Sequence, residues 1–341
     1  MNALFNAMLN RRQMMALGLG ATTMFGLVAC GGSNSGSASS SANSANGSTE
    51  TQKVEVADER EAPEVDAQKF DALVASGPVA DDATIDGNAW ASKIKDAGTL
   101  RIGTTDTSTF FSLLSVSDNV RRGFDAGLYQ MLARYILGDQ TKIDYSKVTS
   151  DTRESVLTGD QVDAVFATYS YTEDRAKQID FAGPYYTSQQ SILVMKSTSD
   201  IASLDDLKGK NVAVQSGSTG PSIMEKLVPE AVLQQFTTDP EARLALEQGR
   251  VDAYVIDNTL NMGSVAKNPS KYQIVGTVFG DIDPYGIGLS KNSEGAVDFV
   301  NDFLKLVEDN GLWAELWQIT IGDRIGSTDV PAPPALGVFT N

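Results

Sequence analysis

The chain has 341 residues, 41% of them hydrophobic and 21% charged, which is enough for one large or two medium globular domains. Its net charge of -17 argues against nucleic acid as a partner, because a polyanion needs a basic face. The sequence has no histidine and one cysteine. This composition excludes Ser-His-Asp and Cys-His catalysis, histidine-based metal sites and a disulfide framework within the chain.

The N-terminus has the pattern of an export signal. The basic pair Arg11 and Arg12 precedes an apolar run over 14–29, which ends in Leu-Val-Ala-Cys at Cys30. This ending resembles a bacterial lipobox, whose cysteine is diacylated and becomes the first residue of the mature protein. An ordinary signal peptide with a chance cysteine is the alternative, and the arginine pair also resembles a twin-arginine export signal. We therefore expect 1–29 to be a lipoprotein signal peptide and Cys30 to be lipidated.

Two segments without a core of their own follow. Residues 30–49 are a flexible tether, because after the cysteine they contain only Gly, Ser, Asn, Ala and Thr. An acylated cysteine with such a tether predicts a protein that is anchored to the cell membrane and works in water on its extracytoplasmic side. Residues 50–87 are acidic, and we expect a partly ordered extension there. Within it, 66–75 has the pattern of an amphipathic helix with an apolar side formed by Phe70, Leu73 and Val74.

Strand and helix patterns alternate through the body that starts at residue 88. Strands are expected at 100–103, 142–148, 162–166, 191–196, 211–214, 251–256 and 285–289. Helices are expected at 90–96, 124–137, 151–157, 203–207, 221–227, 241–246, 297–310 and 312–319. This alternation predicts an α/β sheet with ligand chemistry at the strand ends. The tail over 327–341 is expected to be irregular.

The segment after the strand at 162–166 has the features of an anion pocket. Thr172 is a good N-cap, acidic residues follow it, and Arg175 lies in the first helical turn. A strand end with the Ser170 hydroxyl, free N–H groups and an arginine can hold a small anion. The alternative is a capped surface helix whose arginine pairs with Glu173 or Asp174.

The sequence also contains an internal similarity. Leu157–Ala164 (LTGDQVDA) parallels Leu246–Ala253 (LEQGRVDA), and in both blocks a helix ends near glycine before a Val-Asp-Ala strand. The first strand leads to a polar tip at Ala167–Ser170 and the second to Asp257. Chance similarity is possible over eight residues, but two lobes of like architecture explain the match better.

Residues 100–321 resemble the family 3 solute-binding proteins of ABC transporters, which are receptors for polar amino acids. The motifs that carry this resemblance are Gly98–Thr104 (GTLRIGT), Gly123–Asp125 (GFD), Asp180–Tyr186 (DFAGPYY), Ser203–Lys210 (SLDDLKGK), Val214–Thr219 (VQSGST) and Tyr285–Leu289 (YGIGL). The tip at Ala167–Ser170 with the following Asp-Arg pair looks most like the glutamate-binding branch.

The resemblance implies a two-lobed α/β fold of the periplasmic-binding-protein type (type II), whose lobes close on the ligand. Lobe 1 would comprise 88–191 and 284–326, and lobe 2 would comprise 192–283. The two hinge strands that join the lobes would lie near 191–196 and 285–289.

The resemblance also implies how a zwitterion is held. Arg175 would take the ligand α-carboxylate, helped by Ser170 and the backbone around Thr168, and Asp257 would accept the α-ammonium. Further donors to the carboxylate are expected from the second lobe, at Ser218 and Thr219. Each charge is desolvated only when it is paired, so closure and binding would be one event.

The contacts to the ligand side chain depend on three other residues. Arg153 is expected to meet an acidic side chain, and the alternative is a surface arginine paired with Asp151 or Glu154. Asp106 and Phe110 lie where the family's first loop contacts ligand. The family's usual Tyr/Phe-Pro-Pro-Phe run is replaced by Thr109–Phe111. The alternative for Phe110 and Phe111 is therefore that both pack in the core and do not contact the ligand. Gln215 stands where the glutamine-binding branch has lysine.

We therefore expect a monomeric, lipid-anchored receptor that hands a polar amino acid, with glutamate favoured, to the transmembrane subunits of an ABC permease. We expect no cofactor, no metal and no catalytic residue. Two alternatives are an enzyme on the same fold, such as a dehydratase, and a ligand-sensing module. The sequence leaves glutamate, glutamine, aspartate, cystine and arginine open as ligands.

Overall fold

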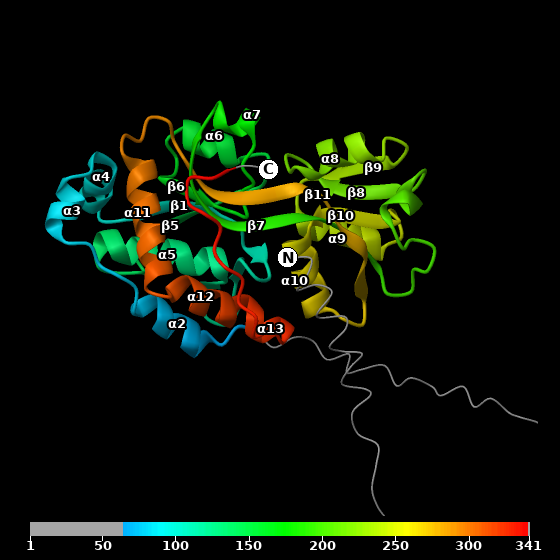
Figure 1. The fold of residues 1–341 in the computed structure, drawn as a ribbon, viewed down its shortest axis with the longest axis horizontal. Coiled ribbons are helices and arrows are strands. Elements are labelled where there is room, and N and C mark those ends of the chain that lie inside the picture. The colour runs from blue at the N-terminus through cyan, green and yellow to red at the C-terminus, as the bar shows by residue number, and fades with distance from the viewer. Residues whose placement is uncertain (1–63, 340–341) are drawn as a thin grey trace, which may run out of the picture. The chain divides into compact units, whose positions relative to one another are not determined.

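The structure, a computed structural model, describes residues 64–339, which belong to one compact unit. Its main sheet has the strand order β5-β1-β6-β11-β7-β10-β8-β9. The two central strands, β7 (Asp180–Met195) and β11 (Tyr272–Leu289), are the longest and pair antiparallel along their length. Figure 1 shows them running side by side from one lobe into the other. This is the two-lobed α/β arrangement expected from the sequence.

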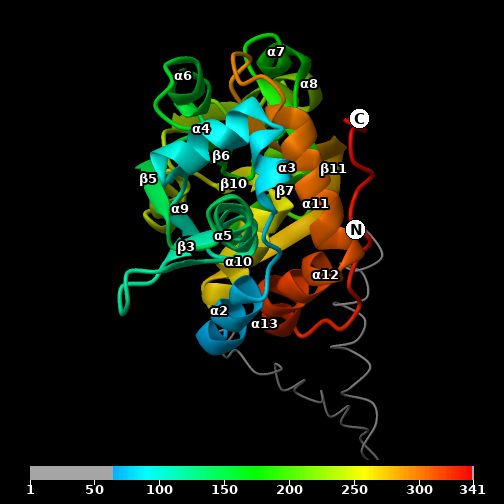
Figure 2. The same ribbon diagram turned by 90° about the vertical axis from the view of Figure 1, so that its left-hand side faces the viewer.

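Lobe 1 is built on three parallel strands, which are β5 (Ile143–Lys147), β1 (Leu100–Thr104) and β6 (Ala164–Phe166). One of its two longest helices, α5 (Phe124–Leu137), is almost entirely buried. In Figure 2 it is seen end-on among α2 (Ala67–Ala75), α4 (Ala89–Ala97) and α12 (Leu312–Trp317), which contact it. The remaining elements of this lobe are α3 (Asp82–Asp86), β2 (Thr107–Ser108), β3 (Ser112–Leu114), β4 (Arg121–Arg122), α6 (Arg153–Thr158), α7 (Glu173–Ala176), α11 (Ala296–Asp309), η3 (Gln318–Gly322) and α13 (Asp323–Ile325).

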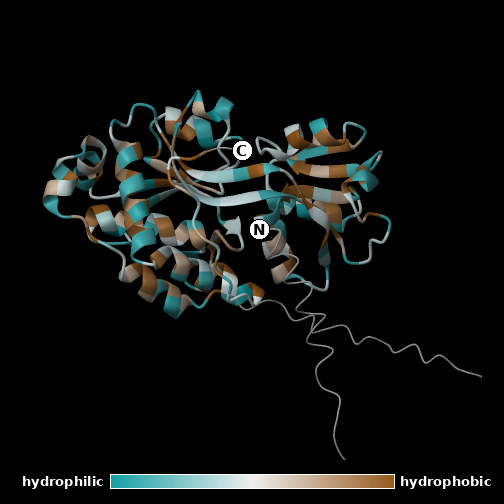
Figure 3. Ribbon diagram, in the orientation of Figure 1, coloured by the Kyte–Doolittle hydropathy of each residue, from teal (hydrophilic) through white to brown (hydrophobic). Residues whose placement is uncertain are grey.

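Lobe 2 continues the sheet on the other side of β7. Its strands are β10 (Ala253–Asp257), β8 (Asn211–Gln215) and β9 (Val232–Phe236), all parallel to one another. Its helices are η2 (Leu204–Leu207), α8 (Gly220–Leu227), α9 (Asp239–Glu247) and α10 (Asn258–Lys267). Figure 3 shows hydrophobic segments along the strands of this lobe, in agreement with the buried Val212, Val214 and Val255.

Where the strands cross between the lobes, the positions of β7 are polar. Ser188 pairs with Asp283, and Gln190 pairs with Phe279. The expected hinge segments at 191–196 and 285–289 lie on either side of this crossing, since Ser191 pairs with β10 and Gly288 pairs with β6. The apolar runs in the sequence therefore mark the parts of β7 and β11 that are buried in a lobe, and the crossing segment of β7 is polar.

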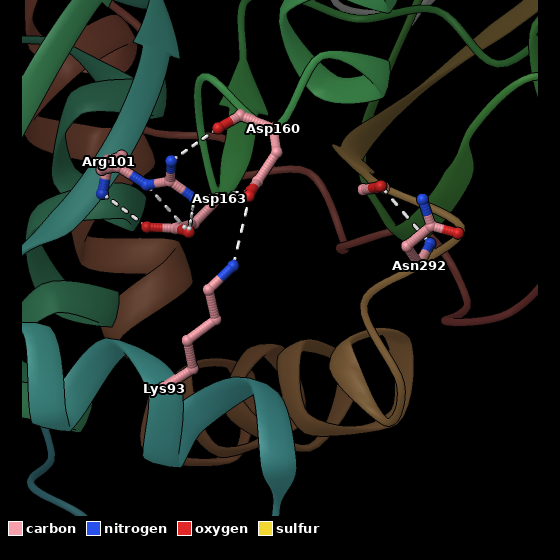
Figure 4. A network of polar contacts seen from close by, with 6 residues as sticks. Lys93, Arg101, Asp160, Asp163 and Asn292 are labelled. Atoms are coloured by element: carbon pink, nitrogen blue, oxygen red, sulfur yellow. Dashed lines mark hydrogen bonds and ion pairs between the residues drawn. The ribbon is translucent and has the colours of Figure 1, made fainter.

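The internal similarity corresponds to a shared structural device. The backbone of Asp163 donates to the Arg101 carbonyl (2.8 Å) and its carboxylate accepts from the Arg101 N–H (2.9 Å). In lobe 2, Asp252 makes the same pair of bonds with Asn211, at 2.7 and 2.8 Å. Lobe 1 adds an ion pair, because Nη2 of Arg101 lies 2.6 Å from Asp163 and 2.8 Å from Asp160 (Figure 4). Two lobes of like architecture are thus present.

The described part of the acidic extension is structured. Over 64–87 it forms α2 and α3, and α2 has the buried apolar side that its pattern predicts. Arg122 fixes this helix to lobe 1 through two bonds to Asp71, at 2.9 and 2.7 Å, so lobe 1 includes chain before residue 88. The signal peptide, Cys30 and the tether lie outside the described residues.

The tail over 327–339 has no helix or strand, as expected, but it packs on lobe 1. The Gly337 N–H donates to the Gly183 carbonyl (2.7 Å), and the Phe339 ring stacks on Tyr171 at 4.7 Å. Within 64–339, no helix has both the length and the apolar character that crossing a membrane requires.

Candidate functional site

A cavity of about 280 Å³ has walls from both lobes. This is close to the lower end of the roughly 300–1,000 Å³ range of small-molecule sites, which suits a small ligand. Its wall in lobe 1 includes Arg153, Thr168 and Ser170, and its wall in lobe 2 includes Gln215, Ser218 and Asp257. Five of the expected ligand-binding residues therefore meet at one cavity.

The lobe 1 wall is held in shape by a buried carboxylate. Thr168 has a positive φ of 45°, an uncommon conformation for threonine that surrounding bonds must support. Its N–H donates to Asp125 (2.9 Å), and the Tyr185 hydroxyl donates to the other oxygen of Asp125 (2.7 Å). Burial raises the pKa of Asp125 to about 6 against the opposing effect of these bonds. Sequence reasoning quoted Asp125 only within a motif and missed this positioning role.

Arg153 faces the cavity from the first position of α6. It is 3% exposed, so the surface alternative does not hold. One of its terminal nitrogens donates to the Ala167 carbonyl (3.1 Å), and its guanidinium lies 4.1 Å from the centre of the Tyr169 ring. Its Nε has no hydrogen-bond partner among the described residues. Burial, with Arg175 nearby, lowers the pKa of Arg153 to about 10, so it stays charged at neutral pH.

Arg175 lies beside the cavity and links the lobes. Its Nη1 donates to the Ser170 carbonyl (2.6 Å), and its Nη2 donates to the Gly217 carbonyl of lobe 2 (2.7 Å). Its Nε lies 3.4 Å from Glu154, whereas Asp174 pairs with Lys177. Arg175 is therefore no solvated surface residue, but it is not among the residues that line the cavity.

Asp257 supplies the negative charge of the lobe 2 wall. It is the last residue of β10 and is 5% exposed. Gln190 donates to one of its oxygens (2.6 Å), and the Tyr285 hydroxyl donates to the other (2.7 Å). Burial raises the pKa of Asp257, while these two bonds and the charges of Arg153 and Arg175 oppose that rise. A cationic group of a ligand would oppose this rise, because its charge stabilises the ionised carboxylate.

The loop before α8, residues 215–219, places only one of its two expected ligand-binding hydroxyls at the cavity. Ser218 lines the cavity, and its hydroxyl donates to the Gln215 carbonyl (2.7 Å). Thr219 is not among the lining residues, because its hydroxyl donates to Asp283 (3.0 Å) and accepts from Gln190 (3.3 Å). The structure thus places one of the two expected hydroxyls at the cavity and the other in the hinge.

The first loop departs from the expected contacts. Asp106 pairs with Arg121 (2.8 Å), and Phe110 is a core residue with 2% exposure. Neither is among the residues that line the cavity. The core alternative for Phe110 therefore holds, and the cavity is instead lined here by hydroxyl side chains, at Thr105, Thr107 and Ser108.

Asp239 is a lining residue that sequence reasoning missed. It is the first residue of α9 and pairs with Arg243 one turn later (2.7 Å). Burial raises its pKa, and one of its oxygens has no hydrogen-bond partner among the described residues. The Thr238–Glu241 capping box marks the helix start in the sequence, but nothing in the sequence shows that this start faces the cavity.

The chain is similar in sequence to known solute-binding proteins. Residues 100–321 match the family described as "Bacterial extracellular solute-binding proteins, family 3". The ABC transporter glutamine-binding protein GlnH of Bacillus subtilis is 34% identical over 226 residues, which are 66% of this chain and 82% of that protein. The glutamate-binding protein GluB of Corynebacterium glutamicum is 28% identical over 236 residues, covering 66% of this chain and 79% of that protein.

Solved structures show the same fold. The cysteine-binding protein from Campylobacter jejuni superposes with a TM-score of 0.67 at 26% identity, over 72% of this chain and 97% of that one. An ancestral arginine-binding protein bound to glutamine gives a TM-score of 0.61 at 33% identity, over 66% of this chain and 98% of that one. The predicted two-lobed fold is confirmed.

Proposed function

The chain belongs to family 3 of the bacterial extracellular solute-binding proteins, and from this premise we propose that it captures a polar amino acid between its lobes and delivers it to an ABC permease. The observation that carries this proposal is the charge on the two walls of the cavity. Arg153 is a buried cation in lobe 1, and Asp257 is a buried anion in lobe 2. A zwitterion satisfies both charges at once, and each wall alone satisfies only one.

The proposed ligand is glutamate. The guanidinium groups of Arg153 and Arg175 lie 4.1 and 5.3 Å from the Tyr169 ring centre, so two cations gather at one wall. Glutamate would bring two carboxylates to this wall and one ammonium group to Asp257, so Arg153, Arg175 and Asp257 would each meet a group of opposite charge. Similarity to GluB supports this choice. Similarity to GlnH supports glutamine as the second candidate, which would leave Arg153 without a carboxylate partner.

The proposed contacts require one exchange. Arg153 presents its guanidinium to the cavity and would take the side-chain carboxylate of the ligand. The α-carboxylate would replace the Gly217 carbonyl as the acceptor of Arg175 Nη2, with Ser170, Thr168 and the neighbouring Ser218 at the same end of the cavity. An arginine–carboxylate pair is stronger than a bond to a neutral carbonyl, so this exchange is favourable.

Calorimetric titration with glutamate, glutamine, aspartate, cystine and arginine tests the function. We expect binding without turnover, tightest for glutamate, with the titrated amino acid recovered unchanged. Tighter binding of glutamine would overturn the choice of ligand and leave the receptor function standing. Chemical conversion of the bound amino acid would favour the enzyme alternative, and binding of none would contradict the proposed function.

We also propose that Cys30 carries the lipid anchor. The lipobox-like tetrapeptide and the polar tether that follows support this proposal. Expressed in a bacterium that processes lipoproteins, the full chain should collect in the membrane fraction, and Cys30→Ser should release it or leave its signal peptide uncleaved. Unchanged membrane association of the processed variant would contradict lipidation.

A further inference from the structure

A second buried carboxylate, Asp283, lies in the hinge behind Asp257. It belongs to the part of β11 that crosses between the lobes, and it is 7% exposed. The Thr219 hydroxyl of lobe 2 donates to it (3.0 Å), and the Ser170 side chain of lobe 1 lies near enough to lower its pKa. The backbone agrees with this placement, because Ser170 bridges to Tyr285 on the same strand. Asp283 thus touches the ligand-binding loops of both lobes.

Hydrogen bonds connect the two carboxylates. The side-chain amide of Gln190 donates to Asp257 (2.6 Å) and to the Thr219 hydroxyl (3.3 Å), and Thr219 donates to Asp283. A short path therefore leads from the anion at the cavity wall to the anion in the hinge. Its members come from β7, β10, β11 and the loop before α8, which are the elements that meet where the lobes join.

The charges around this pair do not neutralise it fully. The groups that face it are the Tyr285 hydroxyl, which donates to Asp257, and the guanidinium groups of Arg153 and Arg175. Arg175 is bonded to two backbone carbonyls and paired with Glu154. Neither carboxylate forms an ion pair within residues 64–339. Two adjacent buried carboxylates without a bonded cation do not both ionise readily.

We propose that Asp283 is a positioning residue of the amino-acid site, and that it and Asp257 share one proton until the ammonium group of the ligand displaces it. This inference rests on the proposed function, since it needs a ligand with a cationic amine. In the empty site the shared proton keeps one negative charge in the network. When the ammonium group reaches Asp257, both carboxylates ionise, and the proton passes to water.

The sign of the pH dependence follows from this exchange. Burial and the charge of Asp257 raise the pKa of Asp283 to about 7, and the arriving ammonium group lowers it again. Below that pH the ligand must displace a proton, so the dissociation constant should rise by up to ~tenfold per pH unit of acidification. Above it the pair is already ionised, and the affinity should level off.

Calorimetry in two buffers with different ionisation enthalpies tests the proposal. At a pH about one unit below 7, glutamate binding to the wild-type protein should release close to ~one proton, which appears as a buffer-dependent binding enthalpy. Asp283→Asn keeps the shape and an acceptor oxygen for Thr219 but removes the titrating group, so its proton release should vanish and its affinity should no longer change across this range. Asp281→Asn, on the same strand but exposed, is the matched control and should release protons as the wild type does.

The outcomes separate this proposal from the function on which it rests. Binding of an amino acid by the wild-type protein without proton release would overturn the proton sharing and leave the receptor standing. Release that persists in Asp283→Asn would also overturn the role of Asp283. If Asp283→Asn does not fold, Thr219→Val is the second variant, because it removes the hydroxyl that connects Gln190 to Asp283. The affinity of Thr219→Val should level off at a different pH from that of the wild type. An unchanged pH profile would contradict the role of this connection. Failure to bind any amino acid would contradict the proposed function itself.

Discussion

Strand β6 of lobe 1 and strand β10 of lobe 2 begin in the same way and lead to opposite charges. Asp163 and Asp252 make equivalent pairs of backbone bonds at the beginnings of β6 and β10. At the other end, β6 leads to a loop beside two buried arginines, whereas β10 ends in the buried carboxylate of Asp257. The aspartate bonds that the lobes share hold neighbouring strands together in each lobe. The charges that differ decide which ligand groups the cavity between the lobes can hold.

Under the proposed function, this difference makes binding depend on both lobes. The ammonium group of a zwitterion would find its buried anion in lobe 2, at Asp257, and its carboxylates would find their arginines in lobe 1, so a ligand held by one lobe would leave a charge unpaired. Arg175 already bridges this gap through Gly217. A ligand that takes over this arginine and also contacts Asp257 would stabilise the arrangement in which the two lobes meet.

The largest effect is expected from Arg175→Ala. This change removes the bond to lobe 2 and the proposed partner of the α-carboxylate, so every amino acid should bind at least ~100-fold more weakly, as expected for breaking a buried charged pair. Calorimetry with several amino acids measures the loss. Lys177→Ala, an exposed cation just after the same helix, is the control and should bind normally. Loss of only one class of ligand would contradict the α-carboxylate role.

Arg153→Met should change selectivity more than overall binding. With no cation at the side-chain end, glutamate should bind ~10–100-fold more weakly, the size expected for losing a charged hydrogen bond, and glutamine should lose less. The ratio of the two dissociation constants is the measurement. Equal losses for both ligands would assign Arg153 to the α-carboxylate instead.

Asp125→Asn should have a moderate effect on binding and alter the pH dependence of stability. The Thr168 loop loses a charged acceptor, so affinity should fall by up to ~tenfold. Because burial raises the pKa of Asp125 to about 6, the folded wild type holds this proton above the ordinary range of a carboxyl, and its stability falls as pH rises through that value. Melting temperatures measured from about pH 4 to pH 7 should fall less steeply in the variant. Parallel curves would show that Asp125 does not titrate in this range.

The smallest effects should come from the shared device at the strand beginnings. Asp163→Ala removes the carboxylate's bond to the Arg101 N–H and the ion pair with Arg101, whereas Asp252→Ala removes only the carboxylate's bond to the Asn211 N–H. We expect losses of ~2–3 and ~1 kcal/mol in the free energy of unfolding, with ligand affinity unchanged in both. Chemical denaturation measures both values. Equal losses would mean that the ion pair of lobe 1 contributes little.

Much of the fold was predictable because its elements have strong local patterns. Helix α5 occupies the predicted range 124–137, and both Val-Asp-Ala strands were found. Strand β9 and helix α10 were missed, since both mix polar and apolar residues without a clear period. The hinge was placed one segment away because apolar runs identify buried strands and not the polar crossing between lobes.

The site was less predictable because it depends on contacts between distant segments. The sequence identified Arg153 and Asp257, whose positions at a helix start and a strand end are local features. It could not show that Phe110 packs in the core, or that Asp125 supports Thr168 across 43 positions of the chain. Asp283 is in the same class, since only the folded chain brings it beside Thr219.

The most direct test of opposite charges on the two walls is a cycle that pairs a protein change with a ligand change. Glutamate and N-acetylglutamate, which lacks the ammonium charge, are titrated by calorimetry into the wild-type protein and into Asp257→Asn. If Asp257 binds the ammonium group, acetylation should weaken binding by ~100-fold or more in the wild type and by far less in the variant, because the two changes remove the same interaction. Losses that multiply independently would contradict the account.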